Sequence, residues 1–162
     1  MTMTLDSETK FLPGIVGRIE AMLAAIPHAL PLLALRIAIA VPFYKSGLTK
    51  WDGFLQLSNG ARYLFTQEFK LHIFGNLVAY PYPIAAATLA GIGEIVLPIL
   101  LVLGLGTRFA ALGILAMTAV IQITVPEGWA NFHLPWAAMA LTLVVFGGGA
   151  ISLDRLLGRA AR

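Results

Sequence analysis

Cysteine is absent from this 162-residue sequence, and its absence excludes several kinds of chemistry. Without a thiol, the chain has no disulfide exchange, no thiolate nucleophile and no iron–sulfur or zinc site built on cysteine. Histidine is also scarce, and none of the three histidines lies four residues from another, as a helical metal site would require. We therefore expect no metal site and no resident cofactor.

Charged residues are few as well. They make up 12% of the sequence, against 59% hydrophobic residues, whereas soluble domains are usually about 25% charged. With a mean hydropathy of +0.84, this composition indicates an integral membrane protein. The net charge of +3 is no sign of nucleic-acid binding, because the basic residues lie at the ends of apolar segments, where membrane topology places them.

Four apolar segments are long enough to cross a bilayer. Their approximate bounds are Ala29–Leu48, Pro83–Leu105, Phe109–Val125 and Leu134–Gly147. The sequence therefore predicts an all-α fold, a four-transmembrane-helix bundle over residues 29–155. The connection 52–82 is too polar to span, and we expect a short amphipathic helix in it to cover one mouth of the bundle.

The flanking segments complete the expected organisation. Residues 1–28 are predicted to form a polar tail and an amphipathic helix that is too short to span. This helix either lies in the membrane interface or packs against the end of the bundle. Ser152 is expected to cap a final short helix. Residues 156–162 form a basic tail suited to anionic lipid or a soluble partner.

The basic residues also predict the orientation. Six of them flank the side that holds both termini and four flank the other side, so we expect both termini in the cytoplasm of a bacterial inner membrane. The amino terminus has no basic region followed by an apolar run, so no cleaved signal peptide is expected. The first span would then act as an uncleaved insertion signal.

Two charges lie inside the apolar segments, where a lone charge is costly. Arg36 is about seven residues, roughly 10 Å, from the inner surface, and Glu94 is about eleven residues, roughly 16 Å, from it. The difference of about 6 Å is within the reach of an arginine side chain. We predict that Arg36 and Glu94 interact inside the bundle, where such a pair either fixes helix register or serves function directly.

A second polar group is expected at the outer mouth. It combines an imidazole, an ammonium group, an amide and flat aromatic rings from Tyr44, Lys50, Trp51, Gln122, His133 and Trp136. Such a set suits a quinone, because its donors can bond to the carbonyls and His133 can carry protons. The alternative is an aromatic belt with snorkelling lysines, which is common at membrane interfaces.

The order of short motifs along residues 30–155 resembles the DoxX family. The motifs are Arg36…Phe43…Gly47-x-x-Lys50, Gly91-x-x-Glu94, Leu103-Gly104-Leu105-x-Thr107-Arg108 and His133-x-x-Trp136…Gly147-x-Gly149-x-x-Ser152-Leu153-Asp154. The resemblance implies a four-helix inner-membrane bundle, distantly similar to the vitamin K epoxide reductase-like bundle. It also implies that the family's polar positions are Arg36, Lys50, Glu94 and His133.

Some members of that family are linked to quinone as subunits of a thiosulfate:quinone oxidoreductase, and others to redox-stress complexes. We therefore predict a membrane subunit of a quinone-linked oxidoreductase, with the bilayer and a redox protein as partners, and leave a homo-oligomer open. The lack of cysteine argues against thiol redox chemistry. Two alternatives stay open: a non-catalytic accessory or anchor protein, and a carrier of protons or small molecules that uses Glu94.

Overall fold

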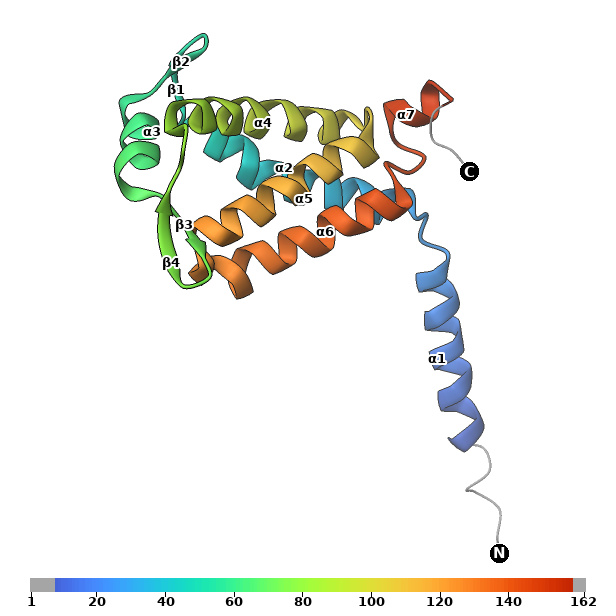
Figure 1. The fold of residues 1–162 in the computed structure, drawn as a ribbon. Coiled ribbons are helices and arrows are strands. Elements are labelled where there is room, and N and C mark those ends of the chain that lie inside the picture. Colours follow the sequence, from blue (N-terminus) through green and yellow to red (C-terminus); the bar gives the residue numbers. More distant parts are fainter. Residues whose placement is uncertain (1–7, 159–162) are drawn as a thin grey trace, which may run out of the picture.

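The computed structural model describes residues 8–158, with side chains described from Gly14 onward. Its centre is a bundle of long helices that run along one direction (Figure 1). The helices are α2 (Ala29–Leu48), α4 (Pro83–Leu103), α5 (Thr107–Thr124) and α6 (Leu134–Phe146). With the turns that lead into α6 from Pro126, all four are long and apolar enough to cross a membrane. The predicted all-α membrane bundle is confirmed.

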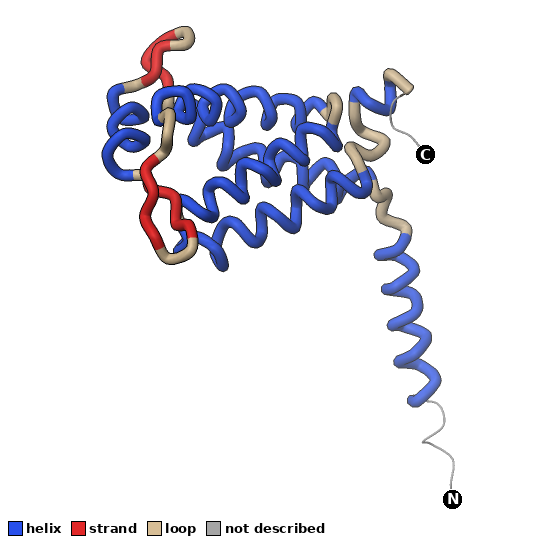
Figure 2. The backbone as a smooth tube through the Cα atoms, in the orientation of Figure 1, coloured by secondary structure: helices blue, strands red, loops and turns tan. Residues whose placement is uncertain are grey.

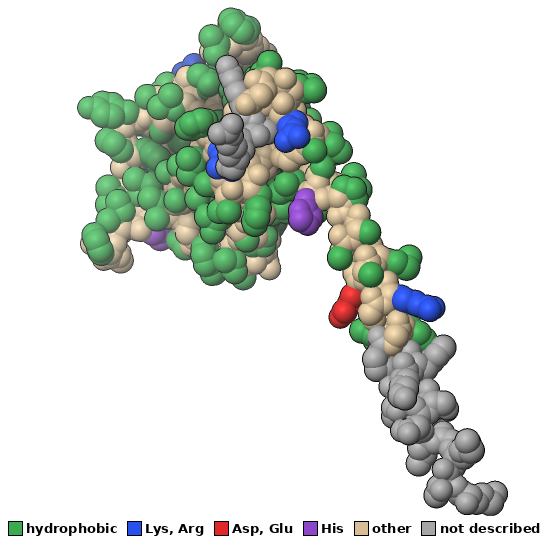
Figure 3. Space-filling view, turned by 90° about the vertical axis from the view of Figure 1, so that its right-hand side faces the viewer, with side chains coloured by type: hydrophobic (Ala, Val, Ile, Leu, Met, Phe, Trp, Pro, Cys, Tyr) green, Lys and Arg blue, Asp and Glu red, His purple; other side chains and the backbone are tan. Residues whose placement is uncertain are grey.

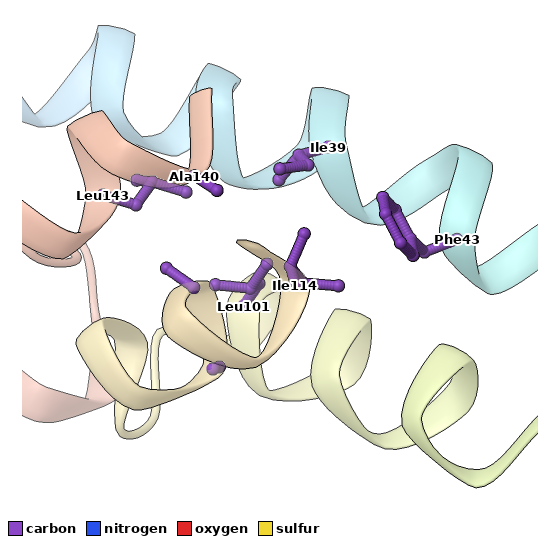
Figure 4. Packing of buried hydrophobic residues seen from close by; sticks show 8 residues of the cluster. Ile39, Phe43, Leu101, Ile114, Ala140 and Leu143 are labelled. Carbon is purple, nitrogen blue, oxygen red and sulfur yellow. The ribbon is translucent and has the colours of Figure 1, made fainter. Parts of the chain in front are cut away.

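The interior of the bundle is a compact apolar core. Helix α2 contacts α4 and α6, and α5 contacts the other faces of the same two helices, so the bundle closes on itself. Side chains from all four helices meet in its centre (Figure 4); they are Ile39, Phe43, Leu101, Ala110, Ala111, Ile114, Ala140 and Leu143. The outward-facing side chains of the bundle helices are apolar too, among them Leu89, Val102, Leu112 and Leu141; apolar side chains also predominate on the end of the bundle that Figure 3 shows. Such a surface suits contact with lipid.

Residues 51–82 fold over one end of the bundle, which we call the hairpin end (Figure 2). Two antiparallel β-hairpins flank a short helix there. The elements in order are β1 (Trp51–Gly53), β2 (Gln56–Leu57), α3 (Asn59–Tyr63), a π-helical turn η1 (Leu64–Glu68), β3 (Lys70–Ile73) and β4 (Asn76–Ala79). The expected short helix over a bundle mouth is present. The hairpins were not predicted, because strands of two to four residues are too short to show a clear alternation.

The opposite end, which we call the terminal end, holds the start of α2 and the last short helix, α7 (Leu153–Leu156). The hydroxyl of Ser152 accepts a hydrogen bond from the Arg155 amide at 3.3 Å, as predicted for a cap. The carboxylate of Asp154 accepts from the amides of Gly106 and Thr107 at 2.7 and 2.8 Å, and thereby caps the start of α5. The C-terminal segment is thus fastened across the end of the bundle.

Helix α1 (Glu8–Ala24) leaves the terminal end and runs across the direction of the bundle helices (Figure 1). Its apolar side chains are exposed, including Val16, Ile19, Met22 and Leu23. The described part of α1 therefore does not pack against the end of the bundle. A helix that runs across the direction of membrane-crossing helices lies along the membrane surface, which favours the interfacial alternative. Of the predicted tails, residues 1–7 and 159–162 lie outside the described residues.

Candidate functional site

The register between α2 and α4 is set by two glycines. A Cβ on Gly47 would lie 2.9 Å from the backbone carbon of Glu94, and a Cβ on Gly104 would overlap the guanidinium of Arg36. Gly47 therefore lies level with Glu94, and Arg36 lies level with Gly104. Since ten residues separate Glu94 from Gly104, Arg36 and Glu94 are roughly 15 Å apart along the bundle.

The predicted interaction of Arg36 with Glu94 is therefore wrong, although both side chains are buried, at 1% and 5% exposed. The prediction assumed that the start of α2 and the end of α4 lie at the same depth in the membrane. In the structure, the end of α2 meets the middle of α4, and the first half of α4 packs against residues 51–82 instead. Each charge therefore has a different partner.

Glu94 pairs with Lys50. The Lys50 ammonium lies 2.5 Å from Glu94 Oε2, and it also donates to the Ser46 hydroxyl at 3.1 Å. Lys50 follows the end of α2, and its side chain turns back by one helical turn to reach both groups. The side chains of Lys50 and Glu94 are only 13% and 7% exposed. This is a buried ion pair in which each charge depends on the other.

Arg36 belongs to the terminal end. Its guanidinium donates to the carbonyl of Ile151, and the negative charge of Asp154 acts on it favourably. These contacts join α2 to the C-terminal segment on the far side of the apolar core. Arg36 therefore stabilises the contact between α2 and the C-terminal segment, away from the Lys50–Glu94 pair.

A cavity of about 530 Å³ lies beside the Lys50–Glu94 pair, toward the hairpin end. Its walls come from α2, α4, α5, α6 and the cover formed by residues 51–82. The lining is mostly apolar and aromatic, and its main members besides the ion pair are Phe43, Phe65, Phe69, Leu89, Met117, Val120, Ile121 and Trp136. The rings of Phe43 and Trp136 are in contact, with centroids 5.0 Å apart.

The cavity opens sideways between α4 and α5. Leu89 on α4 and Val120 on α5 both line it, yet they are 71% and 46% exposed on the outer surface. Farther toward the terminal end the two helices close on each other, because Gly93 packs against Met117 and Gly113 against Leu97. The opening therefore faces the lipid side of the bundle and ends near its middle.

The predicted outer cluster is divided in the structure. Lys50 and Trp136 line the cavity. His133 and Gln122 lie behind Trp136: His133 Nδ1 is 2.7 Å from Gln122 Oε1, and the imidazole centroid is 5.5 Å from the indole of Trp136. These two residues do not line the cavity. His133 is connected to it by the contact between its imidazole and the indole of Trp136.

The other two members of the cluster lie elsewhere. The indole of Trp51 packs against Gly91, where it donates to the carbonyl at 3.4 Å. Tyr44 is 39% exposed and lines a separate apolar groove of about 240 Å³ on the outer face of α2 and α4. Neither residue reaches the cavity.

Two cavity residues were missed by sequence reasoning. The hydroxyl of Tyr80 is 2.7 Å from the hydroxyl of Thr124, and both side chains line the cavity. The sequence signals only a tyrosine in an aromatic-rich connection and a threonine near the end of a span. Their contact depends on the β3–β4 hairpin, which is tied to α5 by a contact of 3.2 Å between His72 Nδ1 and the carbonyl of Ile123.

The described residues hold no group of three or more metal-ligating side chains. The polar chemistry of the cavity therefore consists of the Lys50–Glu94 pair with Ser46 on one side and the Tyr80–Thr124 pair on the other.

Comparison with known proteins gives one family. A family model described as DoxX matches residues 31–127, a range that includes Lys50, Tyr80, Glu94 and Thr124 and ends before Trp136. An uncharacterized protein of Haemophilus influenzae is 30% identical over 149 residues, which cover 85% of this chain and 90% of that protein. No solved structure matches the chain.

Proposed function

The chain belongs to the DoxX family of membrane proteins, and from this premise we propose that it is a membrane subunit that binds a quinone-class lipid for a redox partner. One observation carries the proposal: a buried ion pair stands in the wall of an otherwise apolar cavity that opens toward lipid. A cavity of this kind suits a ligand with a polar ring and an apolar tail.

The residues present fit a quinone. The volume of about 530 Å³ is typical of a small-molecule site. Phe43 and Trp136 offer flat surfaces to a ring. An ammonium group has three N–H donors, and Lys50 uses two of them on Glu94 and Ser46. The third can donate to a quinone carbonyl, while an isoprenoid tail leaves through the opening between α4 and α5.

A bound quinone would supply the capacity to take up electrons, and the chain's own residues would bind and orient it. A packed layer of Ile39, Leu101 and Ile114 lies between the cavity and the terminal end. Because this layer blocks the way across the bundle, a ligand in the cavity would be retained there. A binding role is therefore favoured over a carrier that uses Glu94.

The test is chemical identification of what the purified protein retains. Protein in mild detergent is extracted with organic solvent, and the extract is analysed by mass spectrometry. The proposal expects quinone in a ratio near one per chain. Bulk lipid alone would refute it and would favour a non-catalytic accessory protein.

A matched pair of variants locates the ligand. Leu89→Trp places a large ring at the opening and should abolish quinone retention. Leu141→Trp adds the same ring to an exposed position on α6 that does not line the cavity, and retention should be unchanged. Equal retention by both variants would show that the quinone binds elsewhere.

Substitutions of Trp136 and His133 should weaken quinone retention to different degrees. Trp136→Ala removes a wall of the cavity and should weaken retention strongly. His133→Ala removes only the support behind Trp136 and should weaken retention less. A stronger loss for His133→Ala would mean that the imidazole itself contacts the ligand, which this arrangement does not allow.

A further inference from the structure

Counting donors assigns the hydrogen in the contact between Tyr80 and Thr124. The Thr124 hydroxyl donates to the carbonyl of Val120, one helical turn earlier, at 2.8 Å. A hydroxyl has one hydrogen, so Thr124 has none left for Tyr80. The contact of 2.7 Å between the two hydroxyls is therefore donated by Tyr80.

This assignment makes Tyr80 an acceptor toward the cavity. Its one hydrogen is committed to Thr124, and its oxygen keeps lone pairs that can accept. Elsewhere in the cavity lining, Lys50 has one N–H donor left and the Glu94 carboxylate has acceptor capacity beyond its bond to Lys50. The cavity thus offers one donor on the Lys50 side and acceptors on both sides.

A quinone and a hydroquinone meet this arrangement differently. A quinone has only carbonyl acceptors, so it can bond to Lys50 but faces Tyr80 oxygen to oxygen. A hydroquinone carries two hydroxyl groups, of which one can accept from Lys50 while the other donates to Tyr80. Leaving polar groups unmatched in a desolvated site costs affinity.

We propose that the cavity selects the hydroxyl-bearing, reduced form of its ligand, a hydroquinone, over the quinone. This inference rests on the proposed function and adds which redox form the site holds. One matched hydrogen bond in a buried site corresponds to about tenfold in affinity, so the hydroquinone should bind at least about tenfold more tightly.

The experiment measures both forms on the full chain in detergent, without oxygen. A short-tailed ubiquinone analogue is titrated in its oxidised and its chemically reduced form, and binding is followed by quenching of tryptophan fluorescence, since Trp136 lines the cavity. The expected result is a dissociation constant at least about tenfold lower for the reduced form. Equal constants, or tighter binding of the quinone, would overturn the inference.

Thr124→Val tests the donor count directly. Valine has nearly the shape of threonine but cannot accept, so the Tyr80 hydroxyl is freed to donate to a carbonyl of the ligand. The variant should bind quinone more tightly and lose the preference for the reduced form. Thr142→Val is the matched control, because Thr142 donates to its own helix in the same way and does not line the cavity. A preference that is unchanged in Thr124→Val would overturn the inference.

Tyr80→Phe gives an independent measurement. It removes the acceptor without adding a donor, so the affinity for hydroquinone should fall about tenfold while the affinity for quinone should not fall. A wild-type protein that binds neither form would refute the proposed function itself. Binding of both forms with no effect of either variant would refute only the selection of the reduced form.

Discussion

Replacing Asp154 with alanine should be among the most damaging single changes outside the cavity. Its carboxylate accepts from the amides of Gly106 and Thr107, and its own amide donates to the carbonyl of Gly104 at 2.9 Å. Its negative charge also acts on the buried Arg36. The side chain thus caps α5 and places a negative charge near a buried cation, whereas the backbone bond to Gly104 is kept when alanine replaces Asp154.

The magnitude follows from these roles. Loss of a helix cap costs about 0.5–2 kcal/mol, and a buried amide left without its acceptor costs about 1–3 kcal/mol. Because the two effects share one carboxylate, they do not simply add. We expect Asp154→Ala to lower the free energy of unfolding by about 2–4 kcal/mol. Asp154→Asn keeps an acceptor oxygen but no charge, and should cost about 1–3 kcal/mol.

The assay is reversible denaturation in detergent, followed by circular dichroism. Asp52→Ala is the control, because Asp52 is exposed at the hairpin end and its loss should be nearly neutral. A double-mutant cycle with Arg36→Met should show a coupling of about 0.5–3 kcal/mol between the two charges. The reasoning is refuted if Asp154→Ala unfolds like the control, or if the cycle gives no coupling.

Two further predictions concern the buried pair and α1. Lys50→Met should destabilise the protein by about 3–5 kcal/mol because Glu94 is left buried without its partner. The double variant Lys50→Met/Glu94→Leu should recover most of that loss in the same denaturation assay. If the double variant is no more stable than Lys50→Met, the pairing is contradicted. Because the chain has no cysteine, Met22→Cys and Glu20→Cys each give one labelling site on α1. In vesicles, a polarity-sensitive dye at Met22 should report an apolar environment and the dye at Glu20 an aqueous one; equal signals would contradict an interfacial α1.

The helices could be predicted from the sequence because length and apolar composition decide what spans a bilayer. The relative height of the helices could not. It depends on Gly47 meeting Glu94 and on the first half of α4 packing under residues 51–82, which are tertiary contacts. The predicted height difference between Arg36 and Glu94 was about four residues and the difference in the structure is about ten, and this error assigned Glu94 to Arg36 instead of Lys50.

Only the cavity residues that lie near the ends of the predicted spans could be identified from the sequence. Lys50 and Trp136 belong to the predicted cluster and do line the cavity. Tyr80 and Thr124 are 44 residues apart in the chain, and their contact exists because the β3–β4 hairpin folds back onto α5. No local pattern in the sequence encodes such a return.

The fastening of Arg36 also has a consequence for biosynthesis. Arg36 is in the first span, whereas the carbonyl that it bonds lies 115 residues later in the chain. At about 5–20 residues per second, the ribosome needs roughly 6–23 seconds to make that stretch. During this interval the Arg36 guanidinium lies in the partly synthesised bundle without the Ile151 carbonyl that accepts its hydrogen bond. We expect chains that stall before Ile151 to be degraded faster than chains that extend past it, because only the longer chains contain the carbonyl that accepts from Arg36.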